Sequence, residues 1–160
     1  MCGRYASSAE PAELVDIFDV TVAPRTTLEP DYNVAPTKQV YAVVDRSVDD
    51  RLERMLTAVR WGLVPSWAKD ARIGSRLINA RVETAAEKPS FRSAWARRRA
   101  LLPADGYYEW YLPVADGPLT ATGKPAKQPY FIHRRDGAPL AMAGLYEIWR
   151  DRTVEDPDAE

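Results

Sequence analysis

Short runs rich in aliphatic and aromatic residues recur along the chain, separated by clusters of Pro, Gly, Asp and Asn. This alternation is typical of β-strands joined by turns, because β-branched and aromatic side chains pack well on a pleated surface. The predicted strands cover residues 39–44, 55–63, 100–103, 107–112, 129–133 and 140–149. We expect them to form a curved, mainly antiparallel sheet or an open β-barrel.

Two segments show the periodicity of short amphipathic helices, which makes the predicted class α+β with a few flanking helices. The first covers residues 8–18, where Ser7 and Glu10 have the spacing of a capping box. The second covers residues 90–98, with Ser90 as its expected N-cap.

The other segments are predicted to be loops within one domain. Prolines and turn residues predict an ordered loop without regular structure at residues 20–37 and a flexible hairpin loop at residues 114–127. A chain of 160 residues is long enough for a single hydrophobic core. We therefore expect one domain over residues 1–150, followed by an acidic tail over residues 151–160.

Composition narrows the class of protein. Hydrophobic residues make up 46% and charged residues 28% of the chain, as in soluble globular proteins. We expect no signal peptide and no membrane association, because no apolar run is long enough for either. One cysteine and one histidine far apart cannot supply the usual ligands of a metal site, so we expect no metal and no cofactor.

Charge is distributed unevenly along the chain. Residues 76–99 carry seven basic and two acidic side chains, whereas residues 151–160 carry five acidic and one basic. The basic segment can hold phosphates, and the alternative is a solvated helix face, which we favour for residues 97–99.

Cys2 has a chemical capability that an internal cysteine lacks. Once Met1 is removed, its α-amine and thiol lie on adjacent carbons and form a 1,2-aminothiol. Both titrate near neutral pH, the amine at about 7.7–8.0 and the thiol at about 8.5. The amine condenses with an aldehyde to an imine, and the thiol then closes a five-membered thiazolidine in a favoured intramolecular step. A cysteine at this position is more often incidental, so the interpretation depends on the rest of the sequence.

Six sequence blocks follow one another in a fixed order, beginning with the cysteine at position 2. They are MCGRYA, YNVAPT, RWGLVPSWAKD, INARVET, RALLPADGYYEWY, and KQPYFIH followed by MAGLYEIW. Each block is a weak signal alone, but together they resemble the SRAP family, the SOS response-associated peptidase or abasic site processing group. The resemblance implies an SRAP-like fold and a covalent thiazolidine crosslink between Cys2 and the ring-opened sugar of an abasic site in single-stranded DNA. Such a crosslink shields the lesion from strand cleavage and error-prone copying.

The resemblance also implies catalytic roles for Cys2, Asn79 and Glu109. Asn79 is expected to hydrogen-bond the sugar or to hold the Cys2 amine, and Glu109 to act as general acid and base. Strand alternation places Glu109 on one face with Tyr107 and Tyr111. Without the motifs, Asn79 would be a turn-forming residue before a helix and Glu109 a solvated or salt-bridged carboxylate.

Five further residues are implied in DNA binding. Arg4 and Arg81 are expected to hold phosphates, with buried ion pairs as the alternative interpretation. Trp67 is expected on a loop, where it stacks or wedges beside the abasic nucleotide, and Asn33 and Pro36 border the same site. The resulting affinity should show little sequence preference and a marked dependence on salt. We assign the other tryptophans to the core: Trp61, Trp95, Trp110 and Trp149.

The sequence departs from the family pattern at its end. The pattern continues into a segment with a catalytic histidine, in a His-Asp-Arg-Met-Pro-like motif, before which this sequence stops, so we expect an incomplete SRAP-like domain with an exposed sheet edge. We do not transfer the histidine's role to His133, which lies upstream of that motif. Ring opening and crosslink reversal are then expected to be slower, because a positioned general acid typically contributes about 10²- to 10⁴-fold in rate.

Two alternatives stay open. The first is an N-terminal-nucleophile cysteine peptidase or amidohydrolase, in which the Cys2 amine is the base. The second is a damaged-DNA binding module that acts without a covalent bond. For the crosslinking protein we expect a lyase-type activity, with autopeptidase activity as an additional expectation. We also expect a cytoplasmic location, associated with the nucleoid when bound to DNA.

Overall fold

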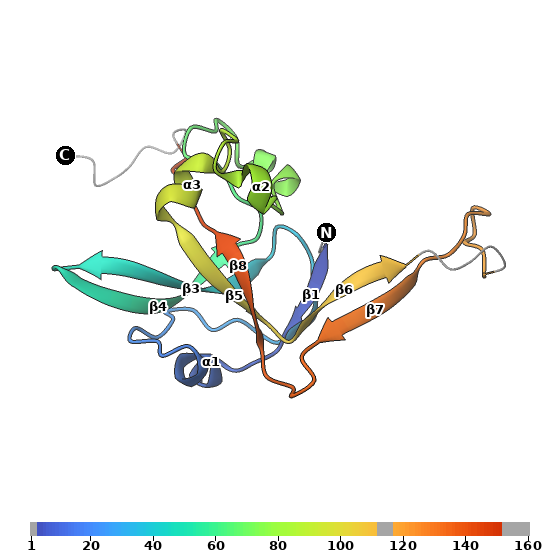
Figure 1. The fold of residues 1–160 in the computed structure, drawn as a ribbon, viewed down its shortest axis with the longest axis horizontal. Coiled ribbons are helices and arrows are strands. Elements are labelled where there is room, and N and C mark those ends of the chain that lie inside the picture. The colour runs from blue at the N-terminus through green and yellow to red at the C-terminus, as the bar shows by residue number, and fades with distance from the viewer. Residues whose placement is uncertain (1–2, 112–116, 152–160) are drawn as a thin grey trace.

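The computed structural model describes residues 3–111 and 117–151, which form two four-stranded antiparallel sheets with few helices (Figure 1). Sheet A has the strand order β2-β1-β6-β7, and sheet B has the order β4-β3-β5-β8. The strands of sheet A are β1 (Arg4–Ser7), β2 (Asp31–Val34), β6 (Gly106–Tyr111) and β7 (Gln128–His133). The strands of sheet B are β3 (Gln39–Val48), β4 (Arg51–Arg60), β5 (Arg99–Ala104) and β8 (Leu140–Leu145).

The predicted α+β class and antiparallel sheet are confirmed, and within the described ranges the strands do not close into a barrel. Only Asp105 separates β5 from β6, so the chain passes directly from sheet B into sheet A. The hairpins β3–β4 and β6–β7 project in opposite directions (Figure 1). The centre of the molecule therefore holds the core, and the two hairpins extend beyond it.

The core lies where the two sheets meet. One buried cluster joins Tyr5 and Val34 of sheet A to Val40 and Ala104 of sheet B. The middle of β3 is buried on both faces, because α1 (Pro11–Ile17) covers the second face with Leu14. This double burial explains the continuous apolar run from which the strand was predicted.

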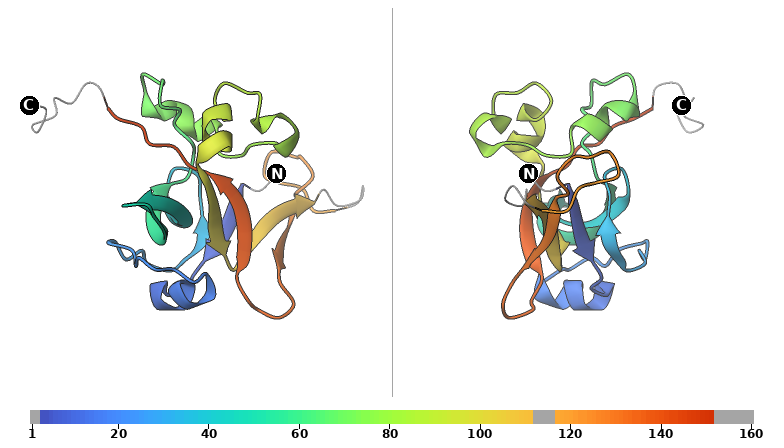
Figure 2. Two further views of the ribbon diagram at one scale, coloured as in Figure 1. Left: turned by 60° about the vertical axis from the view of Figure 1, so that its left-hand side comes forward. Right: turned by 90° about the vertical axis from the view of Figure 1, so that its right-hand side faces the viewer.

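The short helices gather at two ends of the molecule (Figure 2). The 3₁₀ helix η1 (Ala71–Arg76), α2 (Val82–Ala85) and α3 (Arg92–Arg97) lie together at one end, with α1 at the other. None of the helices in the described ranges is long and apolar enough to cross a membrane.

Several predicted boundaries are wrong for physical reasons. Residues 31–34 form β2 within the predicted irregular loop 20–37, because pairing with β1 satisfies their backbone groups despite the nearby prolines. The β3–β4 hairpin extends beyond the predicted strand ends at residues 44 and 55, because cross-strand pairing continues to Val48 and Arg51. Asp49 and Asp50, both with positive φ, form the turn between them. The last predicted strand, 140–149, ends at Leu145.

Both predicted N-caps are also wrong. The N-cap of α1 is Glu10, which makes no side-chain capping bond, and the Ser8 amide instead donates to Asp105 Oδ2 at 2.8 Å. The N-cap of α3 is Phe91 rather than Ser90. A bond between residues 97 positions apart replaces the local capping box, so sequence spacing alone could not reveal it.

Of the tryptophans assigned to the core, only Trp61 is buried. Trp149 is partly buried and donates Nε1–H to the Ala68 carbonyl at 2.7 Å. Trp95 and Trp110 are exposed, which contradicts the prediction. Trp95 lies on the short helix α3 at the edge of an open cleft, and Trp110 lies on the projecting β6–β7 hairpin.

An ion pair fastens the chain after β8 to α3. Arg98 Nη2 lies 2.7 Å from Glu147 Oε2, and the side chains are 22% and 5% exposed, respectively. Glu147→Ala is expected to lower the free energy of unfolding by about 3 kcal/mol, because it leaves the largely buried arginine uncompensated. Urea denaturation measures this loss.

The exposed ion pair between Arg134 and Asp136 provides the control. Asp136→Ala is expected to leave the midpoint of urea unfolding nearly unchanged, because water screens this pair. Equal shifts of the midpoint for the two variants would contradict a stabilising role for the Arg98–Glu147 pair.

Candidate functional site

Seven of the eight residues with a predicted role lie within the described ranges; Cys2 lies outside them. Arg4 is on β1, Asn33 on β2 and Glu109 on β6, so these three come from adjacent strands of sheet A. The others lie on loops and on the helical end of the molecule: Pro36, Trp67, Asn79 and Arg81.

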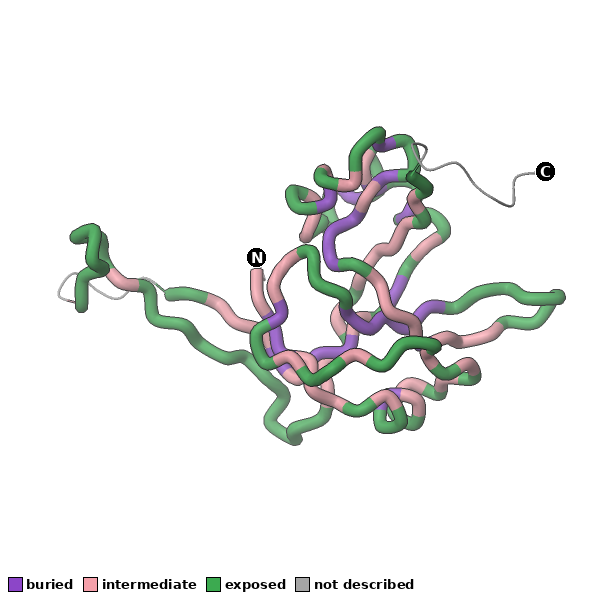
Figure 3. The backbone as a smooth tube through the Cα atoms, turned by 180° about the vertical axis from the view of Figure 1, so that it is seen from behind, coloured by how far each residue is buried: buried purple, intermediate pink, exposed green. Residues whose placement is uncertain are grey.

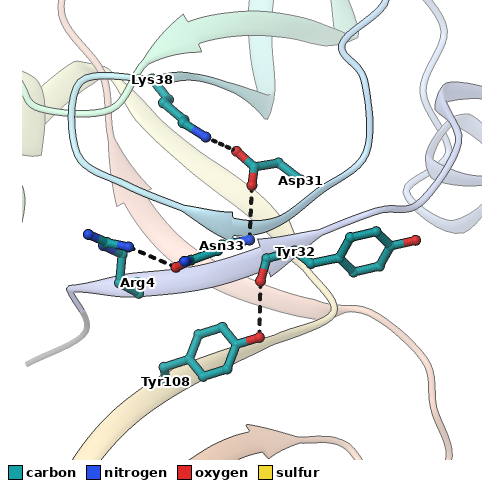
Figure 4. A network of polar contacts seen from close by, with 6 residues as sticks. All are labelled: Arg4, Asp31, Tyr32, Asn33, Lys38 and Tyr108. Carbon is teal, nitrogen blue, oxygen red and sulfur yellow. Dashed lines mark hydrogen bonds and ion pairs between the residues drawn. The ribbon is translucent and has the colours of Figure 1, made fainter. Parts of the chain in front are cut away.

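A polar network holds Arg4 and Asn33 together (Figure 4). Arg4 Nη1–H donates to Asn33 Oδ1 at 2.9 Å, and the backbone N–H of Asn33 donates to Asp31 Oδ1 at 2.9 Å. Lys38 Nζ donates to Asp31 Oδ2 at 2.6 Å. The network thus ties Arg4, the first residue of β1, to Asn33 of β2.

The hydrogen bond from Lys38 holds the pKa of Asp31 below its ordinary value of 3.8. A lowered pKa means that the charged carboxylate stabilises the folded chain above the ordinary value. That contribution is lost as the pH falls through the lowered pKa. The Asp31 carboxylate is therefore charged at neutral pH, and its bonds to Lys38 and Asn33 persist there.

Sequence analysis did not identify Asp31 and Lys38 as supports of the site. The signal was present, because Asp31 and Asn33 form the Asp-x-Asn pattern in which a carboxylate accepts from the amide two residues later.

The register of β1 and β6 assigns side chains to the two faces of sheet A. Arg4 is directly opposite Tyr108, and Tyr5 is directly opposite Tyr107. Paired side chains share a face, and successive residues alternate between faces. We call the face with Arg4 and Tyr108 the outer face, and the face with the buried Tyr5 the inner face. Glu109 lies two residues after Tyr107 and so belongs to the inner face, where it is half-buried.

Asn79 lines an apolar cleft of about 540 Å³ that Tyr5 and Trp61 also line. The Tyr5 and Trp61 rings meet edge to face, with their centroids 5.2 Å apart. Trp61 Nε1–H donates to the Ile78 carbonyl at 2.9 Å, which fixes the residue before Asn79. The apolar lining includes Leu63, Leu77, Phe91, Trp95, Leu102 and Met142. The candidate catalytic asparagine is thus placed on the side of β1 that carries the inner face.

The remaining candidates, Pro36, Trp67 and Arg81, are not among the residues that line this cleft. Pro36 lies in the turn after β2, and the neighbouring Thr37 amide donates to the Trp61 carbonyl at 2.8 Å. Trp67 is exposed on the loop after Trp61, as predicted, and its Nε1–H reaches the Pro89 carbonyl at 3.4 Å. Arg81 is exposed at the N-cap of α2, so the buried ion-pair alternative does not apply to it.

His133 lies away from these residues. It is opposite Gly106 on the outer face, and its ring stacks on Phe131 with centroids 5.5 Å apart. Glu109 lies on the inner face, so the structure does not bring His133 and Glu109 to one face of the sheet. In the described part of the chain, no group of three His, Cys, Asp or Glu side chains is arranged to hold a metal ion.

Close backbone packing positions the Trp67 loop and the Asn79 segment. Gly62 has φ of 118°, and a Cβ there would lie 2.5 Å from the Gly74 carbonyl oxygen. Gly62→Ala is expected to lower the free energy of unfolding by about 1–3 kcal/mol, because both the backbone conformation and the contact oppose a side chain. The shift of the urea midpoint measures this effect.

Gly137→Ala is the matched control, because Gly137 also has a positive φ, of 74°, but no atom within 4 Å of a Cβ. It is expected to lose less stability than Gly62→Ala, since it carries the conformational strain alone. Equal losses for the two variants would show that the Gly62–Gly74 contact does not matter.

Comparison with known proteins identifies the family. Residues 1–159 match the family model described as SOS response associated peptidase (SRAP). The chain belongs to the SRAP family. The SRAP chain is 38% identical over 150 residues to abasic site processing protein YoaM of Bacillus subtilis, a match that covers 93% of this chain and 60% of YoaM. It is 36% identical over 149 residues to abasic site processing protein YedK of Escherichia coli, covering 91% of this chain and 59% of YedK.

Solved structures confirm an SRAP-like fold. A protein from Bacteroides thetaiotaomicron superposes with a TM-score of 0.73 at 25% identity, covering 94% of this chain and 62% of that one. A phage-related protein from Bordetella bronchiseptica gives a TM-score of 0.64 at 34% identity, covering 90% of this chain and 60% of that one. The SRAP chain thus spans about three fifths of the length of the relatives it matches.

Proposed function

We propose that this SRAP chain binds abasic sites in single-stranded DNA and forms a covalent thiazolidine crosslink to them through Cys2. The observation that carries the proposal is the position of β1, which begins two residues after Cys2. β1 is paired on one side with β2, which carries Asn33, and on the other with β6, which carries Glu109. The names of the relatives, which are abasic site processing proteins, support the same substrate.

The strand that follows Cys2 in the sequence pairs with the strand that carries Glu109. In the sequence Cys2 precedes Arg4, the first residue of β1, by two positions. Arg4 is directly opposite Tyr108, the residue before Glu109. In this proposal Glu109 moves protons during condensation of the Cys2 amine with the aldehyde, a role that a carboxylate fills as general acid and base.

The proposed reaction has two bond-forming steps. The Cys2 amine adds to the aldehyde carbon of the opened sugar, and the carbinolamine loses one water to give an imine. The thiolate then adds to the imine carbon, and the nitrogen takes up a proton, which closes the thiazolidine. Glu109 donates a proton to the departing hydroxyl and removes one from the amine, while Asn79 hydrogen-bonds the sugar. The net change is the loss of one water.

The DNA strand is held by charge and stacking in this proposal. Arg4 and Arg81 bind phosphates through their guanidinium groups, and the exposed Trp67 stacks beside the abasic nucleotide. Neither type of contact reads base edges, so the sequence of the strand has little influence on affinity. Binding is expected to weaken steeply with added salt, because phosphate contacts release counterions.

A crosslinking assay tests the proposal. The chain is incubated with a single-stranded oligonucleotide containing one abasic site and, separately, with the undamaged oligonucleotide, and both are run on a denaturing gel. A slower band with the abasic strand alone supports the proposal. No band from folded chain lacking Met1, together with salt-sensitive binding to the same strand, would favour a non-covalent binding module instead.

A further inference from the structure

Four aromatic side chains form a continuous row on the β6–β7 hairpin. We call Trp110, Tyr108, Phe131 and His133 the outer aromatic row. In that order, the centroids of neighbouring rings lie 6.5, 5.0 and 5.5 Å apart. These spacings fall in the range of aromatic contacts, so each ring supports the next.

The whole row lies on the outer face of sheet A. Tyr108 is opposite Phe131, and His133 is opposite Gly106, two positions before Tyr108 on β6. Alternation adds Trp110 to the same face. A Cβ on Gly106 would lie 2.5 Å from Phe131 Cζ, so the glycine leaves the space that the Phe131 ring occupies.

At Tyr108 the row lies beside the Arg4–Asn33 pair. Tyr108 is the cross-strand partner of Arg4, and its hydroxyl donates to the Tyr32 carbonyl at 3.0 Å, which ties β6 to β2 (Figure 4). An arginine assigned to phosphate binding and an aromatic row are therefore contiguous on one surface.

The row is open to solvent. Trp110 and Phe131 are each 42% exposed, and β7 is exposed along its whole length (Figure 3). Aromatic rings that support one another and also face water resemble the surfaces on which bases of single-stranded nucleic acids stack.

The charges around the row fit a polyanion. Lys127 comes directly before β7, and Arg134 and Arg135 directly after it. Arg134 pairs with Asp136. No acidic residue occupies an outer-face position of β1, β6 or β7 as the structure describes them, because Glu109 belongs to the inner face.

We propose that the outer aromatic row is a stacking platform for undamaged bases next to the abasic nucleotide, on the strand that Arg4 holds by a phosphate. This inference rests on the proposed function and adds contacts that do not involve the lesion. Stacking on aromatic side chains tolerates any base, since every base has a π face. The platform thus increases affinity for a longer strand without adding sequence preference.

Fluorescence anisotropy with labelled, undamaged oligothymidylate tests the platform directly. Trp110→Ala and Phe131→Ala are each expected to weaken binding by about 5- to 150-fold, the effect of losing one stacked base. The neighbours Tyr111 and Ile132 are the matched controls, because they are 62% and 40% exposed on the inner face of the same hairpin. Tyr111→Ala and Ile132→Ala are expected to change affinity by less than about twofold, as expected for side chains that touch no stacked base.

Trp110→Phe keeps an aromatic face. Comparing it with Trp110→Ala distinguishes a loss of stacking from a loss of folding. It is expected to retain most of the affinity that Trp110→Ala loses. Equal losses from the outer-face and inner-face alanine variants would overturn the platform. So would wild-type chain with no measurable affinity for undamaged DNA, or Trp110→Phe binding as weakly as Trp110→Ala.

A second readout separates this inference from the proposed function. Crosslinking to a trinucleotide with a central abasic site is expected to be similar for wild type and Trp110→Ala, whereas a longer abasic strand should crosslink less with the variant at limiting concentration. Crosslinking by wild type together with unchanged binding by the outer-face variants refutes the platform alone. Platform-dependent binding without any crosslink refutes the proposed function alone.

Discussion

Replacing Cys2 with alanine is expected to abolish the stable crosslink to abasic single-stranded DNA. Alanine keeps the α-amine, which still condenses with the aldehyde, but it has no thiol to close the ring onto the imine carbon. The imine hydrolyses in water, so no adduct survives on a denaturing gel. The expected change is from a visible band for wild type to none for Cys2→Ala.

The control for this experiment is the non-covalent affinity of Cys2→Ala for the same abasic strand. Phosphate and stacking contacts come from residues other than Cys2, so Cys2→Ala is expected to bind the abasic strand within about twofold of wild type. Anisotropy measured at short times gives this comparison. A stable gel band from Cys2→Ala would contradict the assignment of the nucleophile.

Glu109→Gln is expected to slow crosslinking by about 10²- to 10⁴-fold, the usual contribution of a positioned general acid or base. Glutamine has nearly the same shape and can still hydrogen-bond, but it cannot exchange a proton with the amine or the departing hydroxyl. Single-turnover rates with excess protein measure the effect independently of affinity.

Glu13→Gln is the control for removal of a negative charge, since Glu13 is exposed on α1 at the end of the molecule opposite the other helices. Its rate is expected to match wild type. A Glu109→Gln rate within about threefold of wild type would remove Glu109 from the chemistry and leave it a structural role in β6.

The sequence predicts the central strands well because their burial leaves a clear pattern. Residues 40–44 are apolar without interruption, since α1 covers one face of β3 and the core covers the other. β2 was not predicted because its backbone hydrogen bonds are made to β1, whose paired residues lie 24 or more positions earlier in the chain. Strand pairing over such distances in sequence depends on register and produces little recognisable pattern in the local sequence.

The candidate site was only partly predictable. Motifs indicated which residues to examine, but not that Arg4 and Asn33 would be hydrogen-bonded across 29 positions of sequence. Nor could composition reveal that Trp110 faces solvent. A tryptophan on a strand suits a core and a stacking surface equally, and only the projection of the β6–β7 hairpin beyond the core distinguishes them.

Intact-protein mass spectrometry of the adduct, with and without brief borohydride treatment, tests the central claim most directly. For wild type and an abasic oligonucleotide, the mass should equal protein without Met1 plus oligonucleotide less one water. Borohydride should leave that mass unchanged, because a thiazolidine contains no carbon–nitrogen double bond. An adduct that appears only after borohydride, heavier by two hydrogens, would identify an imine and contradict the thiazolidine.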